Sequence, residues 1–244
     1  MILVAGSLLA ADADKDSIKS AAKKLADSGY SWKQTTENAG GNGGGGGRGG
    51  GGGNFEGKAG KDGTFFVSLP GRNNSTTEGI VKGDKYVVKN ADGEWQTAEE
   101  ITAAAANNAN AGGGGRRGRG GPGAMLRNFK GPAVLVGDMA DDVKEFKTSE
   151  GVTVGDFTED GAKKHVMGGR GGRGGNNPPE ISNAKGTVKY WVKDGAISKV
   201  EYHVTGTISI NGNDRDVDRT TTIEFKDVGS TNVTVPEAAA KKLS

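Results

Sequence analysis

Residues 184–236, AKGTVKYWVKDGAISKVEYHVTGTISINGNDRDVDRTTTIEFKDVGSTNVTVP, decide the fold, because apolar and polar side chains alternate in three successive runs. Residues 187–192, 200–210 and 221–225 each place apolar side chains at every second position, the pattern of a half-buried β-strand. Tight-turn signals lie between the runs at Asp194-Gly195 and Asn211-Gly212. We therefore predict an antiparallel meander with one apolar face.

A second meander is predicted in the first half of the chain. Turn residues such as Lys61-Asp62-Gly63 and Asn90-Ala91-Asp92-Gly93 separate short alternating runs. The predicted strands are residues 30–35 (with Tyr30 and Trp32 facing the core), 55–59, 64–69, 78–82, 85–89 and 94–96. Two shorter strands are predicted at 152–154 and 164–166.

Helical spacing of apolar residues predicts four helices. Residues 17–27 form an amphipathic pattern, and 97–106 begin with a capping box of Thr97 and Glu100. Residues 132–146 and 237–243 complete the set, the last with Pro236 at its start. The order of elements indicates an α+β fold, in which a strongly curved antiparallel sheet, a half-barrel, carries helices on its concave side.

The composition limits the size of the core. Of the 244 residues 45 are glycine, the hydrophobic fraction is 33%, and the net charge is +2. Glycine- and arginine-rich tracts at 40–53, 112–123 and 168–175 lie between predicted elements, so we expect them to be flexible insertions in a single domain of residues 14–244. The chain has no cysteine, which excludes disulfides, thiolate zinc sites and a thiol nucleophile.

The first thirteen residues resemble a secretory signal peptide. An apolar run at 2–10 is followed by Ala11-Asp12-Ala13, an A-x-A cleavage pattern, although no basic residue precedes the run. A short buried strand or helix is the alternative. We expect a periplasmic or secreted protein, with no transmembrane segment in the mature chain, because no other apolar stretch is as long.

Catalytic motifs are absent from the sequence. The two histidines, His165 and His203, belong to no recognisable catalytic arrangement, and no nucleophile-elbow, zinc-protease or phosphate-loop motif occurs. Asp214, Asp216 and Asp218 alternate as in a calcium loop, but the glycine and glutamate of that loop are missing, so a solvated turn is favoured. We predict no enzyme, no cofactor and no metal site.

Arginines in the glycine tracts resemble the RGG segments of RNA-binding proteins. Guanidinium groups in such segments stack on bases and pair with phosphates. The interleaved aromatic residues of such segments are missing here, so nucleic acid is disfavoured and contact with other anionic polymers or lipid head groups stays open. The candidate polyanion contacts are Arg116, Arg117, Arg119, Arg170 and Arg173.

The chain resembles the LolA-like superfamily, which includes the LppX and LprG lipoproteins and the N-terminal domain of periplasmic sigma-factor regulators. The residues that carry the resemblance are the helix at 17–27, the segments 79–88 and 92–95, and the strand 186–192 together with 232–236, which end in Val235-Pro236. Large glycine and arginine insertions depart from the pattern of these carriers.

The resemblance implies a non-enzymatic binding protein that holds a lipid-like or lipidated ligand in the cavity of a half-barrel. Such binding needs only an apolar concavity. The alternative is an exported structural or interaction module whose Gly/Arg loops bind polyanions. The candidate cavity residues, each of which could equally be ordinary core, are Trp32, Phe66, Tyr86, Val88, Trp95, Tyr190, Tyr202, Val204, Ile208, Ile223 and Phe225.

Overall fold

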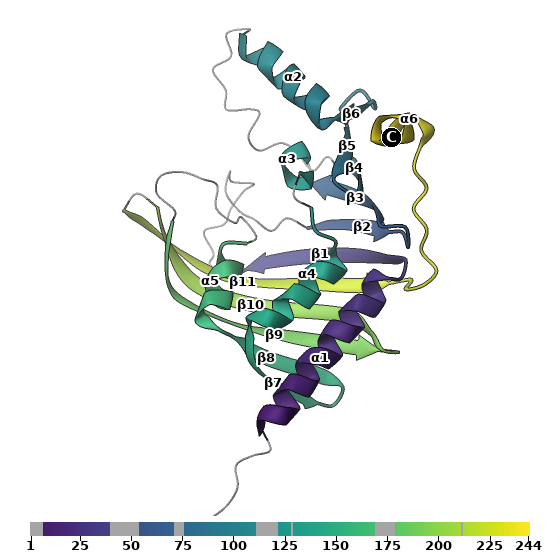
Figure 1. Ribbon diagram of the computed structural model, residues 1–244. Coiled ribbons are helices and arrows are strands. Elements are labelled where there is room, and N and C mark those ends of the chain that lie inside the picture. Colours follow the sequence, from purple (N-terminus) through teal and green to yellow (C-terminus); the bar gives the residue numbers. More distant parts are fainter. Residues whose placement is uncertain are drawn as a thin grey trace, which may run out of the picture. The chain divides into compact units, whose positions relative to one another are not determined.

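The computed structural model describes residues 7–39, 54–70, 76–110, 122–127, 129–168, 179–210 and 212–244 (Figure 1). Within these residues, eleven strands form an antiparallel sheet in the order β6-β5-β4-β3-β2-β1-β11-β10-β9-β8-β7. The order has two free ends, β6 and β7, so the sheet does not close into a barrel. The predicted α+β fold, built on an open antiparallel sheet with helices against it, is confirmed.

The strands are β1 (Tyr30–Asn38), β2 (Phe55–Ala59), β3 (Thr64–Pro70), β4 (Thr76–Lys82), β5 (Lys85–Lys89), β6 (Trp95–Thr97), β7 (Val143–Ser149), β8 (Val152–Phe157), β9 (Glu180–Lys193), β10 (Ala196–Ile210) and β11 (Asn213–Lys226). The helices are α1 (Ser7–Ala26), α2 (Ala98–Asn110), α3 (Pro122–Leu126), α4 (Pro132–Asp138), the 3-10 helix η2 (Met139–Asp142), α5 (Glu159–Val166) and α6 (Glu237–Leu243).

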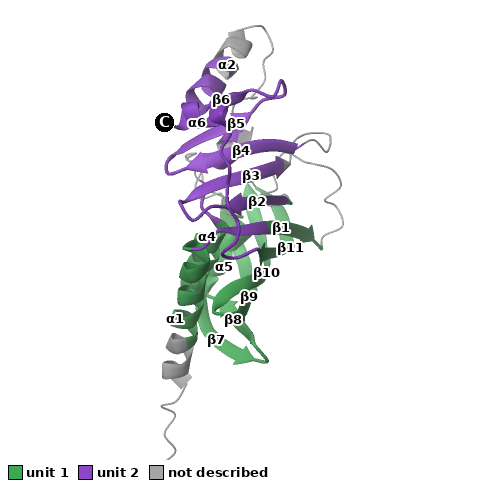
Figure 2. Ribbon diagram, turned by 90° about the vertical axis from the view of Figure 1, so that its right-hand side faces the viewer, with its two compact units in different colours: residues 1–27, 33–54, 132–226 green, residues 28–32, 55–131, 227–244 purple. Residues whose placement is uncertain are grey.

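The chain divides into two compact units, which are coloured separately in Figure 2. Unit 1 comprises Met1–Asp27, Lys33–Asn54 and Pro132–Lys226, and unit 2 comprises Ser28–Trp32, Phe55–Gly131 and Asp227–Ser244.

Unit 1 carries its helices on one face of the long strands (Figure 1). Helix α1 packs on β7, β9 and β10, and α5 packs on β8, β9 and β10. The buried positions of α1 include Ile18 and Leu25, at helical spacing, and opposite them β9 and β10 bury Tyr190 and Val200. The meander β9-β10-β11 pairs as predicted, with Val200 between Tyr190 and Ile223.

Strand β1 joins an early part of the chain to a late one within unit 1. The N–H of Ala39 donates to the carbonyl oxygen of Asp218 at 3.0 Å, and the hydroxyls of Thr36 and Thr221 lie 3.4 Å apart. In the sheet order β1 therefore lies beside β11, the strand furthest along the sequence.

Unit 2 covers both faces of its central strands. On one face Leu126 of α3 lies directly over Gly79 of β4, where a methyl group would overlap the leucine side chain. On the other face Ile80, Val87 and Trp95 form a core cluster with Ala239 and Leu243 of α6. Since both faces of β4 and β5 are buried, these strands are apolar at consecutive positions rather than alternating.

Two predicted elements are wrong. Residues 143–146, predicted as the end of a helix, begin β7, in which the pairing with β8 shifts register between Val143 and Glu145. This irregularity lets Val143 and Phe146, three residues apart, both be buried, a spacing that imitates a helix.

Residues 164–166, predicted as a strand, belong to helix α5 instead. Its N-cap is Thr158, whose hydroxyl accepts a hydrogen bond from the N–H of Gly161 at 3.0 Å. Acidic residues occupy the first turn and basic residues the last, which suits the helix dipole. Asp160-Gly161, which imitates a turn in the sequence, lies in the first turn of this helix.

Helix α1 begins at Ser7, ten residues before the predicted start, and so includes residues 7–13 of the predicted signal peptide. Residues 1–6 and the tract residues 40–53, 112–121 and 169–175 lie outside the described residues. The signal peptide and the single domain at 14–244 stay predictions. In the part of the chain that the structure describes, no helix combines the length and apolarity required to cross a membrane.

Candidate functional site

The predicted cavity residues are divided between the two units. Six belong to unit 1 and lie on the strand face under its helices, namely Tyr190, Tyr202, Val204, Ile208, Ile223 and Phe225. Five belong to unit 2, where Trp32, Tyr86 and Val88 share the face of α3 and Phe66 and Trp95 share the face of α6.

The six residues of unit 1 are mostly ordinary core. Tyr190, Val204 and Ile223 are fully buried, and Tyr202 and Ile208 are half-buried. The Tyr190 hydroxyl donates to the carbonyl oxygen of Val136 in α4 at 3.2 Å, and burial raises the pKa of that hydroxyl well above its ordinary value. Tyr190 is therefore a neutral structural contact between sheet and helix.

An aromatic cluster in unit 2 has a different character. It consists of Tyr30 and Trp32 from β1, Phe65 from β3, and Phe129 from the segment that follows α3. The Trp32 ring centroid lies 6.2 Å from that of Phe65 and 6.2 Å from that of Phe129, and the two phenyl rings lie 5.3 Å apart nearly edge to face. Trp32 is buried, but Phe65 and Phe129 are only half-buried, so the cluster reaches the surface through these two rings.

Two glycines, which have no side chain, leave room for the aromatic rings. The indole of Trp32 lies against Gly57 of β2, where a methyl group would overlap it. A methyl group at Gly131 would lie 2.6 Å from Cζ of Phe65. A side chain at either position would therefore force a ring to move.

The indole N–H of Trp32 is buried without a hydrogen-bond partner among the described residues. Trp32 is 3% exposed, so water does not replace the missing acceptor readily. An unsatisfied buried donor costs about 1–3 kcal/mol. This donor is the one side-chain N or O atom of the described residues that is both fully buried and unpaired.

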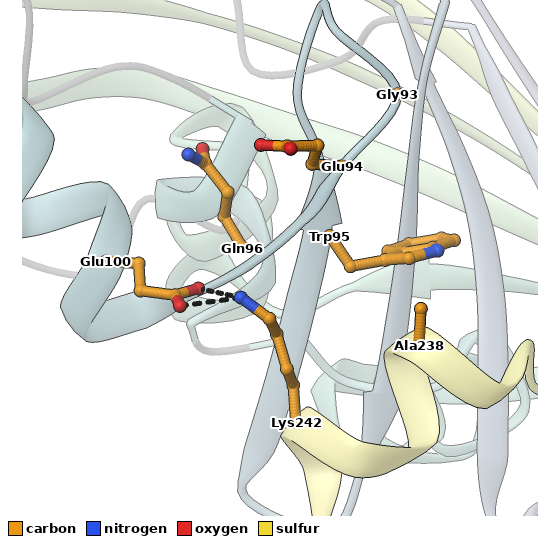
Figure 3. Close-up of a pocket in the computed structure, with 7 residues that line it drawn as sticks. All are labelled: Gly93, Glu94, Trp95, Gln96, Glu100, Ala238 and Lys242. Atoms are coloured by element: carbon orange, nitrogen blue, oxygen red, sulfur yellow. Dashed lines mark hydrogen bonds and ion pairs between the residues drawn. The ribbon is translucent and has the colours of Figure 1, made fainter.

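A pocket of about 560 Å³ opens beside β6 and α6 (Figure 3). It is lined by Gly93, Glu94, Trp95, Gln96, Glu100, Ala238 and Lys242. Lys242 Nζ lies 2.6 Å from both carboxylate oxygens of Glu100, and this hydrogen bond holds the pKa of Glu100 below its ordinary value. The same carboxylate accepts from the N–H of Thr97 at 2.8 Å, which confirms the predicted capping box.

The Glu100 and Lys242 charges thus neutralise each other and hold α2 near α6. Of the eleven predicted cavity residues, Trp95 is the one that lines this pocket. A second hollow of about 290 Å³ lies between α1 and α4, lined by Lys19, Ala22, Lys23, Ala26, Ala133, Val134, Gly137, Asp138 and Asp141. In that hollow Asp141 pairs with Lys15 at 2.9 Å and Lys19 at 2.7 Å.

A buried polar group anchors α5 to the sheet of unit 1. Arg219 of β11 donates to the carbonyl oxygens of His165 at 2.6 Å and Val166 at 3.3 Å, at the end of α5. The His165 ring pairs with Asp142 at 2.8 Å and packs on Phe157. Burial lowers the pKa of His165 below its ordinary value, against the opposing effect of Asp142.

The remaining polar candidates carry no evident chemistry. Asp214, Asp216 and Asp218 pair across the β10–β11 hairpin with Ser209, Thr207 and His203. No group of three or more acidic or histidine side chains in the described residues could hold a metal ion. Arg116, Arg117, Arg119, Arg170 and Arg173 lie outside the described residues, so polyanion binding stays a prediction.

The sequence predicts Trp32 as a cavity residue but does not predict Phe65 or Phe129. Phe65 and Phe66 are adjacent, and either could face the aromatic cluster. Phe65 pairs with Val81 on that face, whereas Phe66 packs on the α6 side. Phe129 lies outside any regular element, so periodicity offered no signal for it.

No protein-family model matches the chain, and no curated protein matches it. The solved structures that resemble it include the lipoprotein LppX of Mycobacterium tuberculosis, at 10% identity and a TM-score of 0.45, covering 92% of this chain and 99% of that one. They also include a LolA superfamily protein of Nitrosomonas europaea, at 8% identity and a TM-score of 0.29, covering 89% and 94% of the two chains. Both names belong to the superfamily whose resemblance is described in the sequence analysis.

Proposed function

We propose that the protein is a non-enzymatic binding protein for a lipid-like ligand, and that the aromatic cluster receives the ligand's apolar chain. The observation that carries the proposal is the partial exposure of this cluster. Phe65 and Phe129 remain half-buried at the surface while they contact a fully buried tryptophan. Contiguous aromatic surface of this kind is typical of sites that bind apolar ligands.

Phe129 follows α3 closely along the chain. After α3, the N–H of Arg127 donates to the carbonyl oxygen of Gly123 and that of Phe129 to Leu126, both at 3.2 Å. These are local contacts within the segment itself. An acyl chain that displaces the Phe129 ring would gain about 0.8 kcal/mol for each methylene group that it buries. Micromolar affinity requires about 8 kcal/mol of net binding free energy, so about 15 or more methylenes must be buried once an association cost of at least about 4 kcal/mol is subtracted.

We also propose that the protein acts outside the cytoplasm, in the periplasm or as a secreted protein. The support is the apolar run at 2–10 with its A-x-A pattern. A fusion of the first thirteen residues to a reporter that is active only after export tests this part by itself.

Quenching of single tryptophans tests the binding proposal. The chain has three tryptophans, so replacing Trp95 and Trp191 by phenylalanine leaves Trp32 as the sole emitter, and replacing Trp32 and Trp191 leaves Trp95. A long-chain fatty acid brominated in mid-chain is expected to quench Trp32 and to spare Trp95, because Trp95 lies on the α6 face. Brominated acetate, which lacks the chain, serves as the matched control ligand.

Native mass spectrometry of the purified protein gives an independent readout. Co-purifying acyl species would support the proposal. A protein that carries no such species and whose Trp32 emission is unaffected by the brominated acid would refute it.

A further inference from the structure

We propose that the ligand carries a neutral acyl carbonyl group, an ester or an amide, whose oxygen accepts a hydrogen bond from Nε1 of Trp32. This inference rests on the proposed function, since it specifies the chemistry of the ligand at the same aromatic cluster. It starts from the buried Trp32 donor, which has no acceptor among the described residues.

The neighbours of the indole do not supply the missing acceptor. The rings of Phe65 and Phe129, each with its centroid 6.2 Å from that of Trp32, carry no oxygen or nitrogen. An indole nitrogen is a donor only, so no change of protonation or tautomer would remove its requirement. The donor therefore needs an acceptor that comes from outside the cluster.

The indole is also held in place. Its six-membered ring lies against the backbone of Gly57, and its centroid lies 6.2 Å from that of Phe129. A side chain held by such contacts cannot turn its N–H toward solvent without losing them. The donor thus keeps a fixed position within the proposed path of the ligand.

This arrangement favours one class of apolar ligand over another. A hydrocarbon chain would bury the cluster further and leave the N–H unpaired. A ligand with a carbonyl group next to its chain would bury the same surface and satisfy the donor, and sites with a buried polar group discriminate against analogues that lack the matching group. A carboxylate is less suitable beside the indole, because its charge would be buried among phenyl rings; a fatty acid would bind with its charged group in solvent and leave the donor unpaired.

Four ligands of equal chain length test the proposal on the full chain. They are methyl decanoate, N-methyl decanamide, the hydrocarbon undecane, and decanoate as the charged form. The ester represents a lipid ester, and the amide represents an N-acylated protein. The one of the two that binds more tightly therefore indicates the natural source of the ligand. Affinity is measured by competition with a fluorescent apolar probe, and the environment of the donor is followed through the Trp32 indole resonance in ¹H–¹⁵N NMR spectra, with Trp95 and Trp191 as internal controls.

We expect the ester or the amide to bind about 5-fold more tightly than undecane, the ratio that one net hydrogen bond provides. We also expect the Trp32 indole proton to shift downfield with these ligands alone. In Trp32→Phe the preference should disappear. The NMR shift is read from the unaltered protein, so the test stands even where that variant folds poorly.

Equal affinities for ester, amide and hydrocarbon, with an unmoved Trp32 resonance, would overturn this inference and leave the proposed function intact. Failure of all four ligands to displace the probe or to perturb the cluster would overturn both.

Discussion

Replacing Gly57 by alanine is expected to destabilise the protein and disturb the aromatic cluster. The new methyl group would overlap the carbonyl oxygen of Phe66 and the Cη2 and Cζ2 atoms of the Trp32 indole. Gly57 pairs with Val67 across β2 and β3, so the backbone cannot retreat without lengthening bonds of this ladder. The indole must move instead, or both strands must distort.

The size of the effect follows from these contacts. Forcing an extra methyl group into a packed site costs about 1–3 kcal/mol. The upper part of this range applies because one of the overlapping atoms belongs to the backbone of β3. An alanine also lowers the conformational entropy of the unfolded chain, which stabilises the folded protein by about 0.4–1 kcal/mol. We therefore expect a net loss of about 2 kcal/mol in the free energy of unfolding.

Urea denaturation followed by circular dichroism measures this loss, and the emission of Trp32 in the variant without Trp95 and Trp191 reports on the indole. Gly206→Ala is the matched control, because it too is a buried glycine within a strand. There the methyl group would lie 3.2 Å from Cγ2 of Val166, 3.3 Å from Cα of Ala184 and 3.4 Å from the carbonyl oxygen of Ser182. These contacts are tight but lack the overlap found at Gly57, so we expect a change below about 1 kcal/mol. A Gly57→Ala protein as stable as the wild type, with unchanged Trp32 emission, would refute the close packing of indole and strand.

Three further predictions concern the polar contacts. Arg219→Met should lower the free energy of unfolding by about 2 kcal/mol, because the carbonyl oxygens of His165 and Val166 lose a charged donor. The control Arg215→Met, at an exposed position, should change the free energy of unfolding little. Equal effects of the two substitutions would contradict this prediction. The pKa of His165 is lowered from 6.5, so its neutral form contributes stability that is complete above about pH 6.5 and declines as the pH falls toward the lowered pKa. His165→Gln, with the neighbouring Asp142, Lys164 and Arg219 unchanged, should reduce the loss of stability that thermal unfolding measures between neutral and acidic pH. An unchanged dependence of stability on pH would show that His165 does not cause this loss. Thr97→Ala should cost about 1 kcal/mol and speed amide exchange in α2 by removing its cap, while unaltered exchange would show that the cap is dispensable.

Local chemistry made much of the fold predictable. The hairpins of β9 to β11 follow from the alternation of apolar and polar residues and from turn residues at Asp194-Gly195 and Gly212, and the start of α2 follows from Thr97 and Glu100. Errors arose where two local patterns coincide. A strand irregularity gives Val143 and Phe146 helical spacing, and Asp160-Gly161 looks like a turn although it opens α5.

The candidate site was less predictable, because it depends on contacts between distant residues. Trp32 alternates with its neighbours and was expected to face inward. Nothing near it in the sequence indicates that Phe65 rather than Phe66 would be its neighbour, or that Phe129 would reach it after a glycine tract. The unpaired state of the indole N–H is likewise a property of the assembled cluster and has no local signature.

The pairing of β1 with β11 has a consequence for the order in which the protein folds. The hairpins of β9, β10 and β11 join neighbours in sequence, so they can form quickly once synthesised. Strand β1 (Tyr30–Asn38) leaves the ribosome long before its partner β11 (Asn213–Lys226) is synthesised. Until then one hydrogen-bonding edge of β1 stays open to unwanted pairing. We therefore expect the docking of β1 onto β11 to be a late step, and the nascent chain to be most vulnerable to aggregation before it occurs.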